Sequence, residues 1–291
     1  MQASPAARLR ELLAKPELQV MPCCFDALSA RLIEEAGFPL SFMSGFAVSA
    51  AKIGAPDTGL ISYGEMVDQG RDICSAVSIP VIGDGDTGYG NALNVKRTVQ
   101  GYAQAGFAAV MIEDQLAPKR CGHTKGKMVV DRDTAYSRIE AAVDARNEGV
   151  DILILARTDA RHTKGLDEAL DRARQFSQIG ADILFVEAPR TEEEMRRVCG
   201  EVPGVHMANL VEGGATPLLP PELLQDIGYR VAAYPLTLLS AAMKAMTDAL
   251  AEMKTGRHPD AQLLEFGDLR RLVGFDAYYD AESRYAGARE D

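Results

Sequence analysis

Short apolar runs alternate with longer amphipathic segments along almost the whole of this 291-residue chain. Near-continuous apolar runs are typical of parallel strands that are covered on both faces. The segments between them place apolar residues at i, i+3, i+4 and i+7 and then stop at glycine, as helices do. The sequence therefore predicts strands at residues 18–24, 39–43, 79–84, 107–113, 151–158, 182–187, 204–209 and 229–234.

The passage from helix to strand repeats along the chain. A predicted helix ends at glycine, and a strand follows, at Gly37, Gly106, Gly180 and Gly228. Eight strand–helix units in roughly 250 residues match a (β/α)8 TIM-type barrel in number and size. A doubly wound α/β sheet is the weaker alternative, because no G-x-G-x-x-G motif follows the first predicted strand. We expect a barrel domain over residues 1–256 and a helical C-terminal extension over 257–291 that serves as an oligomer arm.

The charge balance excludes some classes of partner. The chain has 31 Lys and Arg against 42 Asp and Glu, a formal net charge of −11. A surface of this sign repels phosphate groups, so we expect neither nucleic acid nor an anionic membrane as a partner. No apolar run approaches the roughly 18 residues of a membrane span, and the first residues lack the apolar core of a secretory signal. The five cysteines form no C-x-x-C pair, which favours reduced thiols and a cytoplasmic location.

Acidic side chains follow two neighbouring predicted strands. Asp84 and Asp86 end the third strand and Glu113 ends the fourth. Alternation places Asp84 and Asp86 on one side of an extended segment, and oxygen ligands favour Mg2+ or Mn2+ over zinc. The alternative is that the two aspartates are ordinary turn residues of GDGDTGYGN. Glu113 on the next strand favours the metal site.

Polar residues also end the other predicted strands. The C-terminal ends of barrel strands meet at one mouth, where barrel enzymes keep their active sites. We therefore expect these side chains to converge with the acidic group: Ser44, Gly45, Arg157, Asp159, Glu187 and Asn209.

A polar connection follows the fourth strand and runs to about residue 132. It carries Cys121 between Lys119, Arg120 and His123. A positive field lowers the pKa of a thiol and prepares it for proton transfer. The alternative is a basic surface loop with an incidental thiol. Because a thiol between cations is not the usual structural choice, we expect Cys121 to be functional.

Motifs of one known family then occur in order along the chain: SGF (44–46), GAPD (54–57), GDGDTGYGNALNV (83–95), IEDQ (112–115), KRCGH (119–123), ARTDA (156–160), VEAP (186–189) and NLVEGGATPL (209–218). Together they resemble the isocitrate lyase/phosphoenolpyruvate mutase superfamily from about residue 20 to 255. KRCGH is similar to the signature of its carbon–carbon lyase branch. The resemblance implies a (β/α)8 barrel whose last helix is exchanged within a homodimer, usually inside a homotetramer.

The resemblance also implies a reaction and a metal site. The expected reaction is Mg2+-dependent cleavage of a 2-hydroxy dicarboxylate, such as a substituted malate or 2-methylisocitrate, to a 2-oxo acid and a carboxylate. Asp84 is expected to hold Mg2+ most directly, and Asp86 and Glu113 directly or through water. Asp57 is expected to organise the water shell of the metal.

Substrate and catalytic roles follow where the motifs match. The resemblance implies substrate contacts from Ser44, Gly45, Phe46, Gly122, Arg157 and Asn209. It implies a catalytic group of Cys121, Lys119, His123 and Glu187. In this group Cys121 protonates the released carbanion, and Lys119 and His123 support it.

Two aromatic residues depart from the methylisocitrate lyase pattern. Phe46 stands where that type has glycine, whereas the petal-death type has an aromatic residue there. Phe42 stands where that type has the tyrosine proposed as the catalytic base, so the base is not identified here. Both departures favour a substituted malate over a tricarboxylate as the substrate.

Three rival functions stay open. Oxaloacetate decarboxylation or hydrolysis uses the same metal and enolate chemistry in the same fold. A phosphonopyruvate-type phosphonomutase is disfavoured by KRCGH. From a different class, the chain could be a non-catalytic barrel that binds dicarboxylates. The presence of Asp84, Asp86, Glu113, Cys121 and Arg157 together argues against this.

Overall fold

The computed structural model describes residues 3–120 and 126–286. Among these residues it contains eight strands: β1 (Gln19–Cys24), β2 (Ser41–Met43), β3 (Val81–Asp84), β4 (Ala109–Glu113), β5 (Leu153–Thr158), β6 (Ile183–Val186), β7 (Met207–Asn209) and β8 (Val231–Tyr234). Every predicted strand is confirmed, and each begins one to three residues later than predicted.

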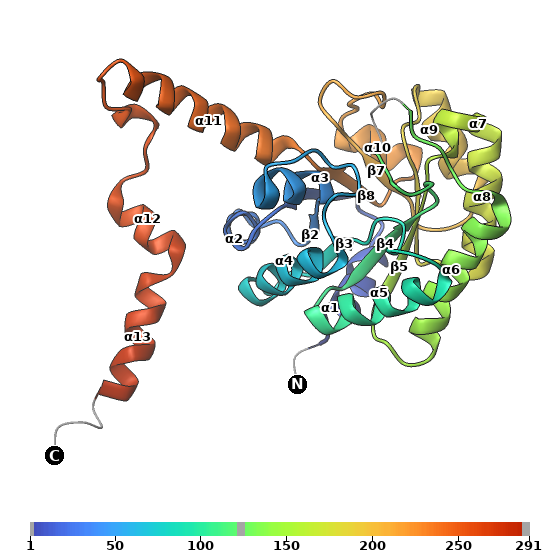
Figure 1. The fold of residues 1–291 in the computed structure, drawn as a ribbon, viewed down its shortest axis with the longest axis horizontal. Coiled ribbons are helices and arrows are strands. Elements are labelled where there is room, and N and C mark those ends of the chain that lie inside the picture. Colours follow the sequence, from blue (N-terminus) through green and yellow to red (C-terminus); the bar gives the residue numbers. More distant parts are fainter. Residues whose placement is uncertain (1–2, 121–125, 287–291) are drawn as a thin grey trace. The chain divides into compact units, whose positions relative to one another are not determined.

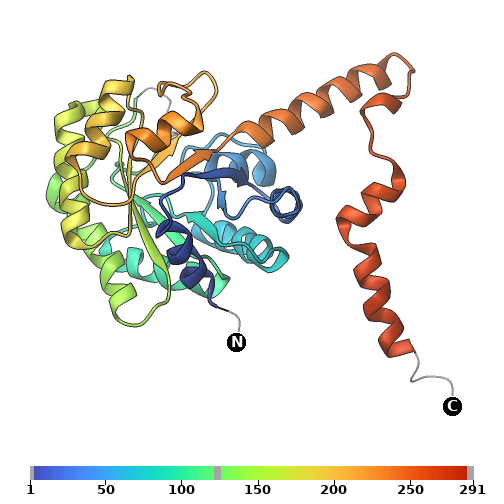
Figure 2. The same cartoon turned by 180° about the vertical axis from the view of Figure 1, so that it is seen from behind.

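Helices follow the strands in chain order (Figures 1 and 2). They are α1 (Pro5–Leu13), α2 (Ala27–Glu35), α3 (Gly45–Val48), α4 (Tyr63–Ala76), α5 (Ala92–Ala105), α6 (Arg132–Asn147), α7 (Ala160–Lys164), α8 (Leu166–Ile179), α9 (Glu192–Glu201), α10 (Pro221–Ile227) and α11 (Thr237–Lys254). Local chemistry sets their ends, as in α5. The Asn91 side chain accepts the backbone N–H groups of Leu93 and Asn94, and Gly106 ends the helix at φ +101°.

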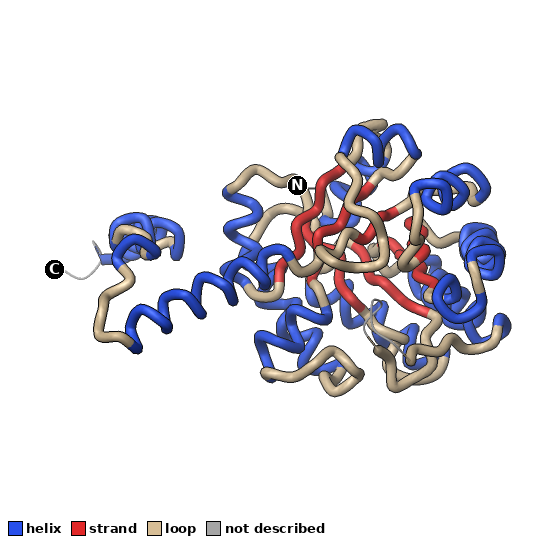
Figure 3. Tube along the Cα trace, turned by 90° about the horizontal axis from the view of Figure 1, so that it is seen from above, coloured by secondary structure: helices blue, strands red, loops and turns tan. Residues whose placement is uncertain are grey.

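The strands form one parallel sheet that closes into the predicted (β/α)8 barrel. Their order is β6-β5-β4-β3-β2-β1-β8-β7. A parallel bridge between Leu184 and His206, with Leu184 N–H donating to Val205 O at 2.8 Å, joins β6 to the start of β7. Figure 3 shows the strands gathered at the centre of this unit with helices around them.

Alternation along each strand separates two layers of the core. In β4, Ala109 and Met111 belong to a cluster that takes side chains from all eight described strands, so this cluster fills the inside of the ring. Val110 and Ile112 instead join the cluster that includes helical residues outside the ring. The next inward position after Met111 is Glu113, at the C-terminal end of the strand.

The chain divides by compactness into residues 1–238 and 239–291. The second unit holds most of α11, a 3-10 turn (Asp260–Gln262), α12 (Phe266–Val273) and α13 (Phe275–Ala286). Along α11, Met243, Met246, Leu250 and Met253 are exposed at helical spacing. The predicted boundary at residue 256, which assigns α11 to the barrel, stays a prediction. Among the described helices, none is long and apolar enough to cross a membrane.

Candidate active site

A pocket of about 580 Å3, part of it open to solvent, lies at the C-terminal ends of the strands. Its lining includes these predicted site residues: Ser44, Phe46, Asp57, Asp84, Glu113, Lys119, Arg157, Glu187 and Asn209. Gly45 and Asp86 lie beside the pocket and are hydrogen-bonded to Asp84. Cys121, Gly122 and His123 lie outside the described residues.

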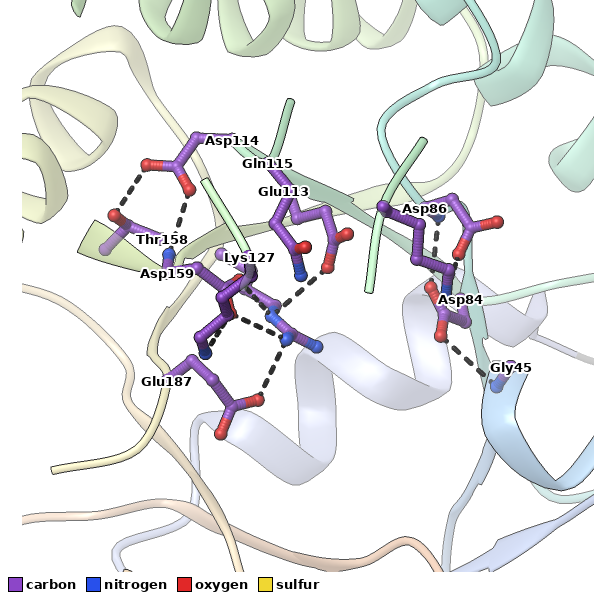
Figure 4. A network of polar contacts seen from close by, with 12 residues as sticks. Gly45, Asp84, Asp86, Glu113, Asp114, Gln115, Lys127, Thr158, Asp159 and Glu187 are labelled. Carbon is purple, nitrogen blue, oxygen red and sulfur yellow. Dashed lines mark hydrogen bonds and ion pairs between the residues drawn. The ribbon is translucent and has the colours of Figure 1, made fainter. Parts of the chain in front are cut away.

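Asp84 organises the turn that follows β3. Its carboxylate accepts the backbone N–H of Gly45 at 3.2 Å and that of Asp86 at 3.0 Å (Figure 4). Its backbone carbonyl accepts the Tyr102 hydroxyl at 2.6 Å. Asp86 adopts a left-handed backbone, with φ +49°, which aspartate tolerates better than most residues. These contacts hold both aspartates at one side of the pocket.

Lys119 joins this group from the connection after β4. Its ammonium lies 2.6 Å from Asp57 Oδ1 and 2.6 Å from Asp86 Oδ1, and all three side chains are buried. Burial raises the pKa of Asp86 to about 7, Asp84 and Asp57 add to the rise, and Lys119 opposes it. Burial alone would lower the pKa of Lys119, but Asp86, Asp84, Asp57 and Glu113 together raise it well above its usual value. Lys119 is therefore a charged ammonium.

Arg157 stands at the opposite side, at the end of β5. Its guanidinium contacts the carboxylates of Asp159 at 2.8 Å, Glu187 at 3.1 Å and Glu113 at 3.3 Å. Its flat face lies 5.1 Å from the Phe185 ring centroid. Asn209 donates from Nδ2 to Glu187 at 3.2 Å. The predicted residues of β4, β5, β6 and β7 thus meet in one hydrogen-bonded group.

The carboxylates in and around the pocket fit a divalent cation. In this group six buried carboxylates stand against three buried cations, Lys119, Lys127 and Arg157. The carboxylates are those of Asp57, Asp84, Asp86, Glu113, Asp159 and Glu187. Within the described residues Glu113 Oε1 is buried without a hydrogen-bond partner. Burial makes such an excess of negative charge costly unless a cation or protons offset it. Mg2+ usually binds one or two carboxylates and keeps several waters. In the described ranges, no three Asp, Glu, His or Cys side chains are grouped closely enough to hold a metal by themselves.

The turn at Ser44 is where the resemblance places substrate contacts, and these contacts stay predictions. The Ser44 hydroxyl accepts the Ala47 N–H at 3.4 Å and so caps α3. The Gly45 N–H donates to Asp84. The reason is that the turn after β2 lies against the end of β3, which brings the Gly45 amide and the aspartate together. Ser44 and Phe46 do face the pocket.

Besides Phe42, which the sequence had already singled out, the structure adds apolar residues to which no role was assigned. Apolar side chains cover part of the pocket wall: Phe42, Met111, Phe185, Met207, Val211, Pro235 and Leu236. Several of these, such as Phe185 and Met207, occupy the inward strand position two residues before Glu187 and Asn209, so alternation could have identified them. Lys127 is buried against Asp159 at 2.7 Å. Nothing in its polar sequence context indicates burial.

Comparison with known proteins gives the family. The family model of phosphoenolpyruvate phosphomutase matches residues 9–254. A 2,3-dimethylmalate lyase from Eubacterium barkeri is 42% identical over 98% of this chain and 99% of that protein.

Solved structures agree with this assignment. An oxaloacetate acetylhydrolase, solved with the inhibitor 3,3-difluorooxalacetate, is 33% identical and has a TM-score of 0.93, with 97% of each chain covered. A phosphonopyruvate hydrolase, solved with oxalate and Mg2+, is 29% identical and has a TM-score of 0.86, with 98% of this chain and 100% of that chain covered. The predicted fold and superfamily are both confirmed. The chain belongs to the phosphoenolpyruvate mutase family, within the isocitrate lyase/phosphoenolpyruvate mutase superfamily.

Proposed function

We propose that this chain is a metal-dependent carbon–carbon lyase that cleaves a substituted malate to a 2-oxo acid, such as pyruvate, and a saturated carboxylate. The predicted enzyme class is borne out by its lyase relative. The observation that supports the substrate class is that both charged and aromatic side chains line the pocket. Carboxylates and Arg157 line the pocket together with Phe42, Phe46 and Phe185. A malate with alkyl substituents has both kinds of surface.

The acidic residues provide the metal site. Asp84 holds the cation most directly, Asp86 and Glu113 bind it directly or through water, and Asp57 orders its water shell. We assign Mg2+, with Mn2+ as a possible substitute, because the donors are all oxygen atoms. When bound, the cation acts as a Lewis acid toward the oxygen atoms of the 2-hydroxy acid.

The basic residues bind and orient the substrate. Arg157 pairs with a substrate carboxylate, because its guanidinium faces the pocket and forked N–H groups match a carboxylate. Ser44 and Asn209 contact the same molecule from the ends of β2 and β7. Glu187, held by Arg157 and Asn209, contacts the substrate from the sixth strand.

Proton delivery is assigned to the connection after β4. Cys121 protonates the carbon atom released by cleavage, with His123 and Lys119 supporting it. The support for this role is the KRCGH motif, together with the charged ammonium of Lys119 two residues before the thiol. The base that takes the hydroxyl proton is left unassigned, because Phe42 has no ionisable group.

The apolar wall governs the choice of substrate. Phe46 and Phe42 narrow the site that would take the third carboxylate of 2-methylisocitrate, and they favour alkyl groups. An apolar pocket distinguishes one methylene group by only about 1–3 kcal/mol, so several 2-alkyl and 2,3-dialkyl malates should react.

A substrate panel tests this function. Release of 2-oxo acid is followed with lactate dehydrogenase for 2,3-dimethylmalate, 2-methylmalate and 2-methylisocitrate, and conversion of phosphonopyruvate is followed by phosphorus NMR. We expect the highest kcat/KM for a dialkylmalate, loss of activity in excess EDTA, and recovery with Mg2+ or Mn2+. A preference for the tricarboxylate would contradict the assignment of Phe46 and Phe42. Full activity in excess chelator would contradict the metal site.

Oxaloacetate hydrolysis or decarboxylation is the second candidate. The similarity to an oxaloacetate acetylhydrolase at a TM-score of 0.93 favours it. Its test is the formation of oxalate and acetate, or of pyruvate and carbon dioxide, from oxaloacetate. A higher kcat/KM for oxaloacetate than for every alkylmalate would put this candidate first.

We further assign a homodimer with exchanged C-terminal helices, assembled into a homotetramer. The exposed apolar stripe Met243, Met246, Leu250 and Met253 on α11 supports this assembly, since such a stripe is typical of a helix that packs on a partner. Light scattering coupled to size-exclusion chromatography measures the mass directly.

The free thiols of Cys23, Cys24, Cys74 and Cys199 support a cytoplasmic location.

A further inference from the structure

A buried lysine stands behind the substrate arginine. The Lys127 side chain is 0% exposed, and its ammonium lies 2.7 Å from Asp159 Oδ1 (Figure 4). Lysine is almost never fully buried unless it is paired, and removing its charge from water is costly. Neither Lys127 nor Asp159 lines the pocket, whereas Arg157 does.

Asp159 links this lysine to Arg157. Its Oδ2 accepts Arg157 Nε at 2.8 Å, and its Oδ1 accepts both Arg157 Nη2 at 3.1 Å and the Lys127 ammonium. The two-point contact fixes the plane of the guanidinium, because a forked donor matches a carboxylate in one orientation. The Asp159 N–H donates to Asp114 Oδ1 at 2.9 Å, which holds the aspartate itself in place.

The charges around Arg157 show why a second cation is needed. Asp159, Glu113 and Glu187 all contact its guanidinium, so the carboxylates outnumber it three to one. Lys127 offsets the charge of Asp159. Burial would raise the pKa of Asp159, but Arg157 and Lys127 together hold it below its usual value. With Asp159 shared in this way, more of the positive field of Arg157 is left for an anion in the pocket.

The backbone at the two ends of the connection after β4 fixes the position of Lys127. Leu116 N–H donates to Met128 O at 2.8 Å, Val130 N–H donates to Asp114 O at 2.9 Å, and Gln115 pairs with Val129 as an antiparallel bridge. Residue 127 is thus held next to the pair that closes the base of this connection. Its contact with Asp159 joins the connection to the end of β5.

We propose that Lys127 is a positioning residue for substrate binding, which acts through Asp159 to orient Arg157 and to keep its charge available to the substrate carboxylate. This proposal rests on the proposed function, because Arg157 must bind an anionic substrate. It adds a residue from outside the pocket to the substrate-binding machinery. Substrate affinity distinguishes this role from that of a lysine that only stabilises the fold.

The test is a double-mutant cycle on binding of oxalate in the presence of Mg2+, measured by calorimetry on the full chain. Oxalate is a dianion of the size of the 2-oxo acid core. Lys127→Met should weaken oxalate binding by about tenfold, as loss of a supporting residue commonly does. In an Arg157→Lys background the same change should cost less than about twofold, because a lysine cannot keep the two-point contact with Asp159.

Controls separate positioning from stability. Lys96→Met removes a lysine that pairs with Glu148 outside the pocket, and it should leave oxalate affinity unchanged. If Lys127→Met does not fold, Lys127→Gln, which retains a donor to Asp159, replaces it in the cycle. A folded variant with wild-type affinity, or equal losses in both Arg157 and Arg157→Lys backgrounds, would overturn the positioning role. Failure of the wild type itself to bind oxalate would overturn the substrate site, and this proposal with it.

Discussion

A methyl group added at Gly45 should disturb the metal site although no charged residue is replaced. A Cβ atom built on Gly45 would lie 2.4 Å from Asp84 Oδ2 and 3.1 Å from its Cγ. Carbon and oxygen atoms normally approach no closer than about 3.5 Å, so the carboxylate or the turn must shift by about 1 Å. The carboxylate that moves is the one that we assign as the principal metal ligand.

The size of the effect follows from what Asp84 holds. Its carboxylate accepts the N–H groups of Gly45 and Asp86, at 3.2 Å and 3.0 Å, and a shift of about 1 Å breaks this geometry. A misplacement of that size in an active site costs on the order of 100-fold in rate. Poor orientation of a ligand costs about 10–100-fold in metal affinity. We therefore expect Gly45→Ala to lower kcat/KM by about 100-fold and to weaken Mn2+ binding by about 10–100-fold.

The assay compares this change with the same change elsewhere. Mn2+ affinity is measured by calorimetry, and 2-oxo acid release is measured over a range of Mg2+ concentrations. Gly200→Ala is the control, because a Cβ at Gly200 in α9 meets no atom within 4 Å. A helical alanine there should leave activity unchanged and stabilise the fold by up to about 1 kcal/mol.

Excess Mg2+ should recover part of the lost activity of Gly45→Ala, because the defect lies in metal affinity. Wild-type Mn2+ affinity together with wild-type kcat/KM in this variant would refute the reasoning. It would show that the position of the Asp84 carboxylate does not control the metal site. A loss of kcat at unchanged metal affinity would assign Asp84 a role other than ligation.

Three further changes test other parts of the account. Burial raises the pKa of Asp86 to about 7, so this carboxyl group must lose a proton before a cation binds. Metal affinity measured by calorimetry should therefore reach its full value above about pH 8 and be about tenfold weaker at pH 6. Cys121→Ser should lower kcat on an alkylmalate by about 10²–10⁴-fold with little change in KM, whereas Cys199→Ser, a thiol whose pKa burial raises to about 12, should lose little activity. Arg172→Met removes the guanidinium that pairs with the buried Asp114 carboxylate at 3.0 Å and should destabilise the fold by about 3–5 kcal/mol in urea titrations.

The barrel could be predicted because its strands are buried on both faces. Their apolar runs stand out from the amphipathic helices, and glycines such as Gly106 mark the returns to the sheet. The same alternation that fills the ring also aims the site residues. In β4 and β5, Met111 and Leu155 point inward, so Glu113 and Arg157 two residues later point into the mouth.

The rest of the site depends on contacts between distant segments. Lys127 lies in a stretch with no apolar periodicity, and its burial is explained by a contact with Asp159, a residue distant in the sequence. The hydrogen bond from the Gly45 amide to Asp84 likewise depends on the packing of the turn after β2 against β3. The ionic groups were recognisable from residue type and strand position. Their partners could not be predicted, because the paired residues come from segments that meet only when the barrel closes.

The products of a single turnover experiment in D2O test the central claim most directly. The purified chain is incubated with Mg2+ and 2,3-dimethylmalate, and the products are read by proton NMR. The account predicts pyruvate and propionate in equal amounts, with one deuterium at C2 of propionate from protonation of the released carbanion. Unchanged 2,3-dimethylmalate, or propionate without deuterium at C2, would contradict it.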